Sequence, residues 1–356
     1  MTVGCGTDRV ILVVDLTGEK VELSERLGDC DLRYVLAGGG GWGYGDFQLD
    51  PLSLDYLTRA LNEIDDALTR GSAWLALVDA MLDARLGPER LFDTLTQALA
   101  RESDEQLANA MLGDLSTVWW RFFTPSMRQE RAAQLEAELR QGLERAESPS
   151  FKAAWFRHLR SLAITPETVS WLRAVWLQEQ DVPGLVMAES DYTALAQELA
   201  VREVSGWLDI LDTQLERIQN PDRRLRFQFV RPVLSSDREE RLRWFLALRQ
   251  LEARRHEPWV IEGLRYLHHP LRADTSAALV RPALEMLVEI QKTGDIFFPT
   301  RWLGATLNGH GSPQVAATVQ AFLVEQTNGY PPRLSELILQ NADILFRAAR
   351  TRAFQD

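Results

Sequence analysis

GPERLFDTLTQALARESDEQLANAMLGDLSTVWWRFFTP, residues 87–125, is the stretch of this sequence that decides the fold. Its apolar residues recur every three or four positions, which places them on one face of an α-helix. They are Leu91, Leu95 and Leu99 and, after a polar break, Leu107, Met111, Leu115 and Trp119. A Pro near each end suits the first turn of a helix. The stretch therefore predicts two amphipathic helices that bury their apolar faces.

The same kind of helix start recurs along the chain. Asp50-Pro51, Gly87-Pro88 and Thr124-Pro125 are spaced 37 residues apart. Such a spacing fits one helix pair per repeat, as in HEAT-like or armadillo-like arrays. Further starts are expected at Ser148-Pro149, Thr165-Pro166, Asn220-Pro221 and Ser312-Pro313, and at Ser190 as a capping residue. We predict a mainly α fold, with a HEAT-like or armadillo-like superhelix over residues 49–356.

Residues 1–48 have a different pattern. Val10–Leu16 is apolar and β-branched, Thr17–Lys20 suits a turn, and Val21–Leu23 follows, so a hairpin is predicted. Another strand is expected at Leu32–Ala37, before the glycines of residues 38–41. These glycines lack the GK[ST] continuation of a phosphate-binding loop, and they are typical of a tight or flexible connection. The sequence thus predicts a small β segment over residues 1–48.

Composition and charge limit the function classes. The formal net charge is −12 and the pI is near 5.1, whereas nucleic-acid binding needs clustered Lys and Arg. The basic runs around Arg223–Arg226 and Arg254–His256 stand among acids, so we expect them to be solvated or ion-paired at the surface, with anion binding as the alternative. The acidic charge therefore argues against a nucleic-acid partner. The longest apolar run, Val10–Val14, is far too short for a membrane span, so no membrane partner is expected either.

The chain contains two cysteines, Cys5 and Cys30. Both lie in the predicted β segment and could pair, but two cysteines are too few for a disulfide scaffold or a four-ligand zinc site. We expect free thiols in a reducing compartment. No signal-peptide pattern is evident, and a cytoplasmic location is predicted.

The sequence offers no recognisable catalytic or metal site. A zinc-peptidase helix needs the HExxH pattern, and no His here has another His four positions later. His268 and His269 are adjacent, so on a helix their side chains point about 100° apart and rarely bind one ion. Asp65, Asp104 and Asp191 fall at expected helix starts, where an acid stabilises the first turn. We predict no catalytic residue, metal ligand or cofactor in this chain.

Several runs nevertheless resemble one family. HHPLR at residues 268–272, EIQKTGDIFFPTRW at 289–302 and NPDRR with FVRP between 220 and 232 are similar to segments of bacterial zinc aminopeptidases of the aminopeptidase N family. YPPRL at 330–334 and ADILFRAA at 342–349 resemble the end of these enzymes. Gly43–Phe47 resembles the last strand of their β-sandwich. The likeness covers nearly the whole chain, without the catalytic domain.

This resemblance implies a function. In such enzymes a non-catalytic C-terminal helical domain closes over the zinc domain and contacts the far end of bound peptides. The parent enzyme, which would hold the zinc, releases residues from peptide N-termini. The implied partners are peptide substrates and the parent's catalytic domain. Arg231 and Arg301, in family-like segments, are candidates to bind a peptide carboxylate, although pairing with nearby acids is an alternative for both.

Two other functions stay open. The first is a stand-alone α-solenoid that binds a peptide or protein partner on its concave face. The second is an enzyme with unrecognised chemistry, which would require a tight cluster of titratable residues in one pocket.

Overall fold

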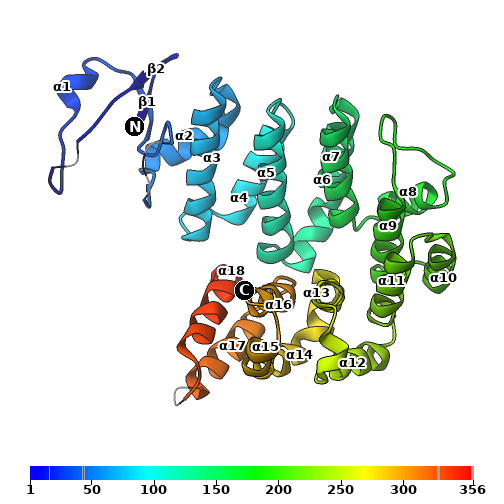
Figure 1. Ribbon diagram of the computed structural model, residues 1–356. Coiled ribbons are helices and arrows are strands. Elements are labelled where there is room, and N and C mark those ends of the chain that lie inside the picture. The colour runs from blue at the N-terminus through cyan, green and yellow to red at the C-terminus, as the bar shows by residue number, and fades with distance from the viewer. Residues whose placement is uncertain (16, 42, 44, 327–328, 354–356) are drawn as a thin grey trace. The chain divides into compact units, whose positions relative to one another are not determined.

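A computed structural model describes residues 1–15, 17–41, 43, 45–326 and 329–353 (Figure 1). The protein is mainly helical with a small sheet near its N-terminus, and this part of the fold prediction is confirmed. The chain divides into two compact units, Met1–Val118 and Trp119–Asp356, and each is described by itself. The domain boundary expected after residue 48 stays a prediction.

The first unit contains the sheet and the first helices. Its elements are β1 (Thr2–Cys5), β2 (Asp8–Ile11), α1 (Ser24–Leu27), β3 (Leu32–Leu36), α2 (Pro51–Ala60), the 3₁₀ turn Leu61–Glu63, α3 (Ala67–Leu82), α4 (Pro88–Leu99) and α5 (Glu105–Thr117).

The sheet has the antiparallel order β2-β1-β3. The prediction of a strand at Leu32–Ala37 is confirmed by β3, but the hairpin predicted over residues 10–23 is wrong. The hairpin lies earlier, because β1 pairs with β2 across a turn at Gly6, whose φ of +59° suits glycine. No strand forms at residues 43 and 45–47, contrary to the prediction for Gly43–Phe47, and Tyr44 lies outside the described residues.

The two cysteines form a disulfide. Cys5 ends β1, and Cys30 stands just before β3, which pairs with β1, so their Cα atoms are 5.1 Å apart. The sheet therefore brings the two thiols within the range that a disulfide needs. The expectation of free thiols is wrong for this structure.

All regular secondary structure in the described residues of the second unit is helical. It contains α6 (Pro125–Arg145), α7 (Pro149–Leu162), α8 (Pro166–Trp176), α9 (Glu189–Val201), α10 (Trp207–Arg217), α11 (Pro221–Leu234), α12 (Arg238–Ala247), α13 (Glu257–Leu267), α14 (Ala273–Glu285), α15 (Leu287–Thr293), α16 (Phe298–Leu307), α17 (Pro313–Glu325) and α18 (Pro332–Ala353). A π-helical turn at Val118–Phe122 precedes α6, and 3₁₀ turns lie at Leu251–Arg254 and Pro270–Arg272.

All seven helix starts marked by a Pro are confirmed. In each, Pro is the first helical residue; Asp50, for example, accepts hydrogen bonds from Leu52 N and Ser53 N. Asp104 caps α5 as predicted, whereas Asp66 rather than Asp65 caps α3. The cap predicted at Ser190 is wrong. Helix α9 begins at Glu189, and the Asp191 carboxylate accepts a hydrogen bond from Ala188 N.

Hydrogen bonds join the beginning and the end of the second unit. Arg121 donates to Leu307 O at 2.8 Å and to His310 O at 2.7 Å. Arg352 of α18 donates to Arg121 O at 2.6 Å. Between these ends, α11 to α18 share one buried apolar cluster that includes Phe298 and Trp302, both at most 1% exposed. These contacts hold the helices that carry the cavities described below.

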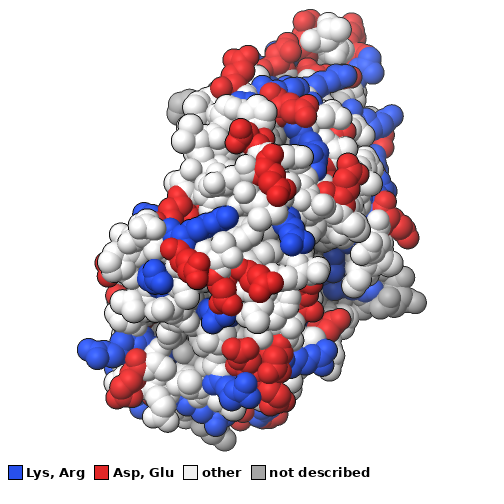
Figure 2. Space-filling view, turned by 90° about the vertical axis from the view of Figure 1, so that its right-hand side faces the viewer, with Lys and Arg blue, Asp and Glu red and all other residues white. Residues whose placement is uncertain are grey.

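Several charged side chains of the second unit form ion pairs. Arg223 pairs with Glu189 and Arg226 with Glu262, as expected for one basic run, whereas Arg254, which pairs with Glu289, is buried and not at the surface. On the face in Figure 2, positive and negative side chains are interleaved. No helix in the described ranges combines the length and the apolar composition that a membrane span requires.

Candidate functional site

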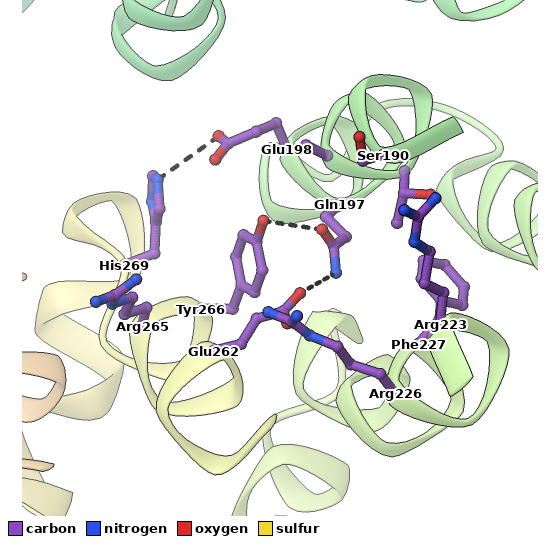
Figure 3. Close-up of a pocket in the computed structure, with 12 residues that line it drawn as sticks. Ser190, Gln197, Glu198, Arg223, Arg226, Phe227, Glu262, Arg265, Tyr266 and His269 are labelled. Carbon is purple, nitrogen blue, oxygen red and sulfur yellow. Dashed lines mark hydrogen bonds and ion pairs between the residues drawn. The ribbon is translucent and has the colours of Figure 1, made fainter. Parts of the chain in front are cut away.

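Helix α13 carries a polar stripe that lines a cavity of about 430 Å³ in the second unit (Figure 3). Glu262, Arg265 and Tyr266 follow the spacing i, i+3, i+4 and so lie on one side of α13, and His269 follows shortly after the helix ends at Leu267. Helices α9 and α11 form the other walls. They contribute Ser190, Thr193, Ala194, Gln197 and Glu198, and Arg223, Arg226 and Phe227. We call this the first cavity.

One hydrogen-bonded chain crosses the first cavity. Tyr266 Oη donates to Gln197 Oε1 at 3.1 Å, and Gln197 Nε2 donates to Glu262 Oε1 at 2.8 Å. The other Glu262 oxygen accepts from Arg226 Nε. Burial raises the pKa of Tyr266 well above its usual value, so the phenol keeps its proton and remains a donor. The three helices are thereby joined through groups that satisfy one another.

A second group of charges lies at the edge of the same cavity. Glu198 forms an ion pair with Arg202, and His269 Nε2 is 3.8 Å from Glu198 Oε2. His269 Nδ1 accepts from Leu271 N at 3.2 Å, so the ring hydrogen belongs on Nε2, toward Glu198. Burial lowers the pKa of His269 to about 4 although Glu198 opposes this shift. The imidazole is therefore neutral at pH 7.

These engagements limit the chemistry of the first cavity. It does hold the cluster of titratable groups that an unrecognised enzyme would need. Both His269 nitrogens, however, face partners. Burial alone would raise the pKa of Glu198, but the charge of Arg202 outweighs burial, so the pKa of Glu198 is lowered. A general base needs a free lone pair within reach of a substrate proton. The arrangement suits binding better than proton transfer.

A smaller, second cavity of about 290 Å³ adjoins the first, because Arg265 lines both. Its walls come from the end of α13 and from α16. They are formed by Arg265, His268, Pro270, Arg301, Gly304, Ala305, Asn308 and Gly309. No carboxylate is among them. Within the described part of the chain, Arg265 has no ion pair, and the Arg301 guanidinium lies only over the Phe297 ring, 5.7 Å from its centroid.

His268 adds a buried polar atom to the second cavity. Its Nδ1 is 2.9 Å from His310 Nε2, while its Nε2 is buried and has no hydrogen-bond partner in the described residues. Burial lowers the pKa of His268 well below its usual value and that of His310 to about 4, so both rings are neutral. When His310 Nε2 donates, His268 Nε2 must carry a hydrogen. It is then a buried donor without a partner in the described residues.

Arg121 offsets the negative end of α16 beside this cavity. Its guanidinium binds Leu307 O and His310 O, and it donates to Asn308 Oδ1 at 2.8 Å. The C-terminal end of a helix is partly negative and would repel an anion. The positive charge of Arg121 offsets that repulsion. It also fixes Asn308 with its oxygen turned to Arg121, so the amide nitrogen remains available as a donor.

The structure separates the two arginines expected to bind a carboxylate. Arg301 lines the second cavity, whereas Arg231 pairs with Asp212 and lines neither cavity. Arg265 stands beside Arg301 instead, and sequence reasoning missed it. The signal was present, since Glu262, Arg265, Tyr266 and His269 form a polar stripe beside the buried Val260, Ile261 and Leu264. Seeing what faced that stripe required the positions of α9, α11 and α16.

The rings of His268 and His269 diverge, one toward His310 and one toward Glu198. The described residues contain no group of three or more His, Cys, Asp or Glu that could hold a metal ion. We therefore derive no step through zinc on this chain. A scan of protein-family models and a search of curated proteins found no match to the sequence.

Proposed function

We propose that this chain is the non-catalytic C-terminal part of a zinc aminopeptidase and that its second cavity receives the carboxylate end of a bound peptide. One observation carries the proposal. Two separate family-like runs meet at this cavity: His268 and Pro270 come from HHPLR, and Arg301 comes from TGDIFFPTRW. A peptide cut from its N-terminus has a free carboxylate at its other end.

The donors of the second cavity suit that group. Guanidinium groups can bind carboxylates through two parallel hydrogen bonds, and hydrogen bonds to charged groups contribute about 1.5–3 kcal/mol each. Arg265 and Arg301 supply the positive charge, and His268 Nε2 would add a neutral donor in the tautomer in which His310 Nε2 donates to His268 Nδ1. A bound anion also favours the tautomer in which His310 donates to His268. Arg231, proposed earlier for this task, stays an untested candidate.

The first cavity would hold the part of the peptide nearer to the catalytic domain. Its internal hydrogen bonds make a firm wall, and Arg223, Glu198 and Glu262 offer charges of both signs to side chains. Together the cavities would select peptides by length and exclude water when the parent enzyme closes. Removal of this part from the parent should reduce turnover of peptides more than turnover of small chromogenic substrates; equal losses would contradict this role.

The HEAT-like arrangement of the helices, the partners and the cellular location are part of the same proposal. Starts 37 residues apart each begin a helix pair, α2 with α3 and α4 with α5, which supports HEAT-like pairing. The partners would be peptides and the parent's catalytic domain, and zinc would reside in that domain. We place the protein in the cytoplasm. The Cys5–Cys30 disulfide is typical of oxidising compartments and argues against this location. Thiol labelling in extracts tests it: a cytoplasmic protein should carry both cysteines largely reduced, and an intact disulfide would contradict the placement.

The size of the native protein tests whether a parent exists. An antibody against this chain should detect, in its source cells, a band well above 40.4 kDa. A band at 40.4 kDa would contradict the proposal and would favour a stand-alone α-solenoid that binds peptides or proteins.

A further inference from the structure

A third cavity, of about 400 Å³, lies in the second unit on the other side of the Glu198–Arg202 ion pair from the first cavity. The end of α9, the start of α12, the turn Pro270–Arg272 and α14 enclose it. Its walls are Val201, Arg202, Glu203, Ser236, Arg238, Arg241, Leu271, Arg272 and Thr275. Four of these nine residues are arginines, and one is acidic.

Two of the arginines are buried beside each other. Arg241 is 5% exposed and Arg272 is 4% exposed. Arg272 donates to Val233 O at 2.7 Å and to Leu234 O at 2.9 Å, and Arg241 donates to Ser235 O at 2.5 Å. These bonds cap the end of α11, whose partial negative charge is worth about half an elementary charge. That charge balances only part of two guanidinium groups.

The remaining charges leave an excess of positive charge. Arg202 is balanced by Glu198, and its guanidinium also donates to the carbonyls of Ala163 and Arg160. Of the other lining residues, Arg238, Arg241 and Arg272 are positive and Glu203 is negative, an excess of two. The Glu203 carboxylate is 3.9 Å from Arg272, and it is half exposed. Asp237, outside the cavity, caps α12 by accepting from Glu239 N.

Several donors at this cavity have no partner in the described residues. Arg272 Nε is buried without a hydrogen-bond acceptor. Arg238 and the Ser236 hydroxyl are exposed at the cavity and form no ion pair or side-chain hydrogen bond in the described chain. Burial, together with the neighbouring Arg241, lowers the pKa of Arg272 to about 10, as expected where a cation lacks a full counter-charge.

We infer that the third cavity binds a phosphate group, either as inorganic phosphate or as part of a small phosphorylated molecule. A phosphate monoester carries about −1.5 to −2 charges at pH 7, which matches the excess of two. Its oxygens accept from several directions, as Arg238, Arg241 and Ser236 require. The inference does not depend on the proposed function.

Calorimetric titration of the full chain with inorganic phosphate, at constant ionic strength, tests this inference. We expect saturable binding and a rise in Tm with phosphate that equal chloride does not produce. Arg238→Gln should weaken binding about tenfold without altering the fold, because Arg238 is exposed and unpaired. Glu203→Gln should strengthen binding several-fold, because it removes the acid that competes for Arg272.

Arg249→Gln is the matched control. It removes another exposed arginine, one that does not line the cavity, and should leave phosphate binding unchanged. Absence of phosphate binding beyond the effect of chloride would overturn the inference, as would equal weakening by Arg238→Gln and Arg249→Gln. Titration with glycerol phosphate then identifies the source: tighter binding than that of inorganic phosphate indicates a phosphorylated molecule, and equal binding indicates the free ion.

Discussion

The polar side chains of helix α13 and of the residues just after it differ between the two cavities in whether they have protein partners. Toward the first cavity, Glu262, Tyr266 and His269 bond to groups of α9, α11 and the following turn. Toward the second, Arg265 and His268 Nε2 have no partner among the described residues. Polar groups that satisfy one another hold helices together, whereas donors without a protein partner can bind a ligand. This difference is our reason for proposing the carboxylate site in the second cavity rather than in the first.

The largest effect is expected at Gly309, where two backbone segments meet. A Cβ there would lie 1.4 Å from His268 O, a backbone atom that cannot yield without moving the end of α13. Gly309→Ala should therefore reduce the free energy of unfolding by about 3 kcal/mol or more in urea titrations. Unchanged stability would mean that α13 and the segment after α16 do not meet as described, and the second cavity would lose its wall.

Gly304→Ala is the control for that substitution. A Cβ at Gly304 would be 3.5 Å from Asn308 Nδ2, an ordinary contact, inside helix α16. Because alanine favours a helix over glycine, stability should stay equal or rise by about 0.5–1 kcal/mol. The added methyl group would still narrow the second cavity.

Acid should destabilise the second unit through its buried histidines. The pKa values of His269 and His310 are about 4 in the folded protein, against 6.5 for an unperturbed histidine. The unfolded chain therefore takes up more protons between these values, and stability falls as the pH drops from about 6.5 to 4. The loss approaches about 3 kcal/mol for each histidine.

Unfolding titrations across this pH range measure the slope. His269→Asn retains an acceptor for Leu271 N but cannot be protonated, so the variant should lose less stability than the wild type on acidification. A slope identical to that of the wild type would show that His269 is not kept neutral by burial.

Tyr266→Phe tests the hydrogen-bonded network across the first cavity. It removes the donor to Gln197 and should cost about 0.5–1.5 kcal/mol of unfolding free energy. If denaturant titration gave no loss, the network across the first cavity would contribute nothing to the packing of α13 against α9.

The smallest change in stability is expected for the arginines that line the second cavity. Arg265→Gln and Arg301→Gln remove exposed guanidinium groups without an ion-pair partner, so the free energy of unfolding should stay within about 0.5 kcal/mol of wild type. Arg231→Gln, which breaks the ion pair with Asp212, should cost up to about 1 kcal/mol. A larger loss for Arg265 or Arg301 would mean that they serve the fold.

Local signals predicted the helices better than the sheet or the sites. A capping residue followed by Pro acts within one turn, and every such start from Asp50-Pro51 to Ser312-Pro313 begins a helix. The hairpin at residues 10–23 failed because Thr2–Cys5, which has little apolar pattern, pairs with both neighbours and joins Cys5 to Cys30. Strand pairing is nonlocal, so composition alone could not identify the partner strand.

The candidate site was predicted only in part, for a related reason. Arg301 could be predicted from the family-like run TGDIFFPTRW. That Arg265 lines the same cavity depends on how α13 and α16 pack. Arg265 and Arg301 are 36 positions apart in the sequence and meet only at the second cavity. Arg231 looked equivalent in the sequence, and only the position of α10 reveals its pairing with Asp212.

The most direct test of the account is the affinity of this chain for one short peptide with a free carboxylate and for the same peptide amidated at that end. We predict at least tenfold tighter binding of the free acid by calorimetry, equivalent to about 1.4 kcal/mol. The difference should vanish when Arg265→Gln and Arg301→Gln are combined, and persist in Arg231→Gln. Equal affinities for the two peptides, or a difference that survives the combined substitution, would contradict a carboxylate site in the second cavity.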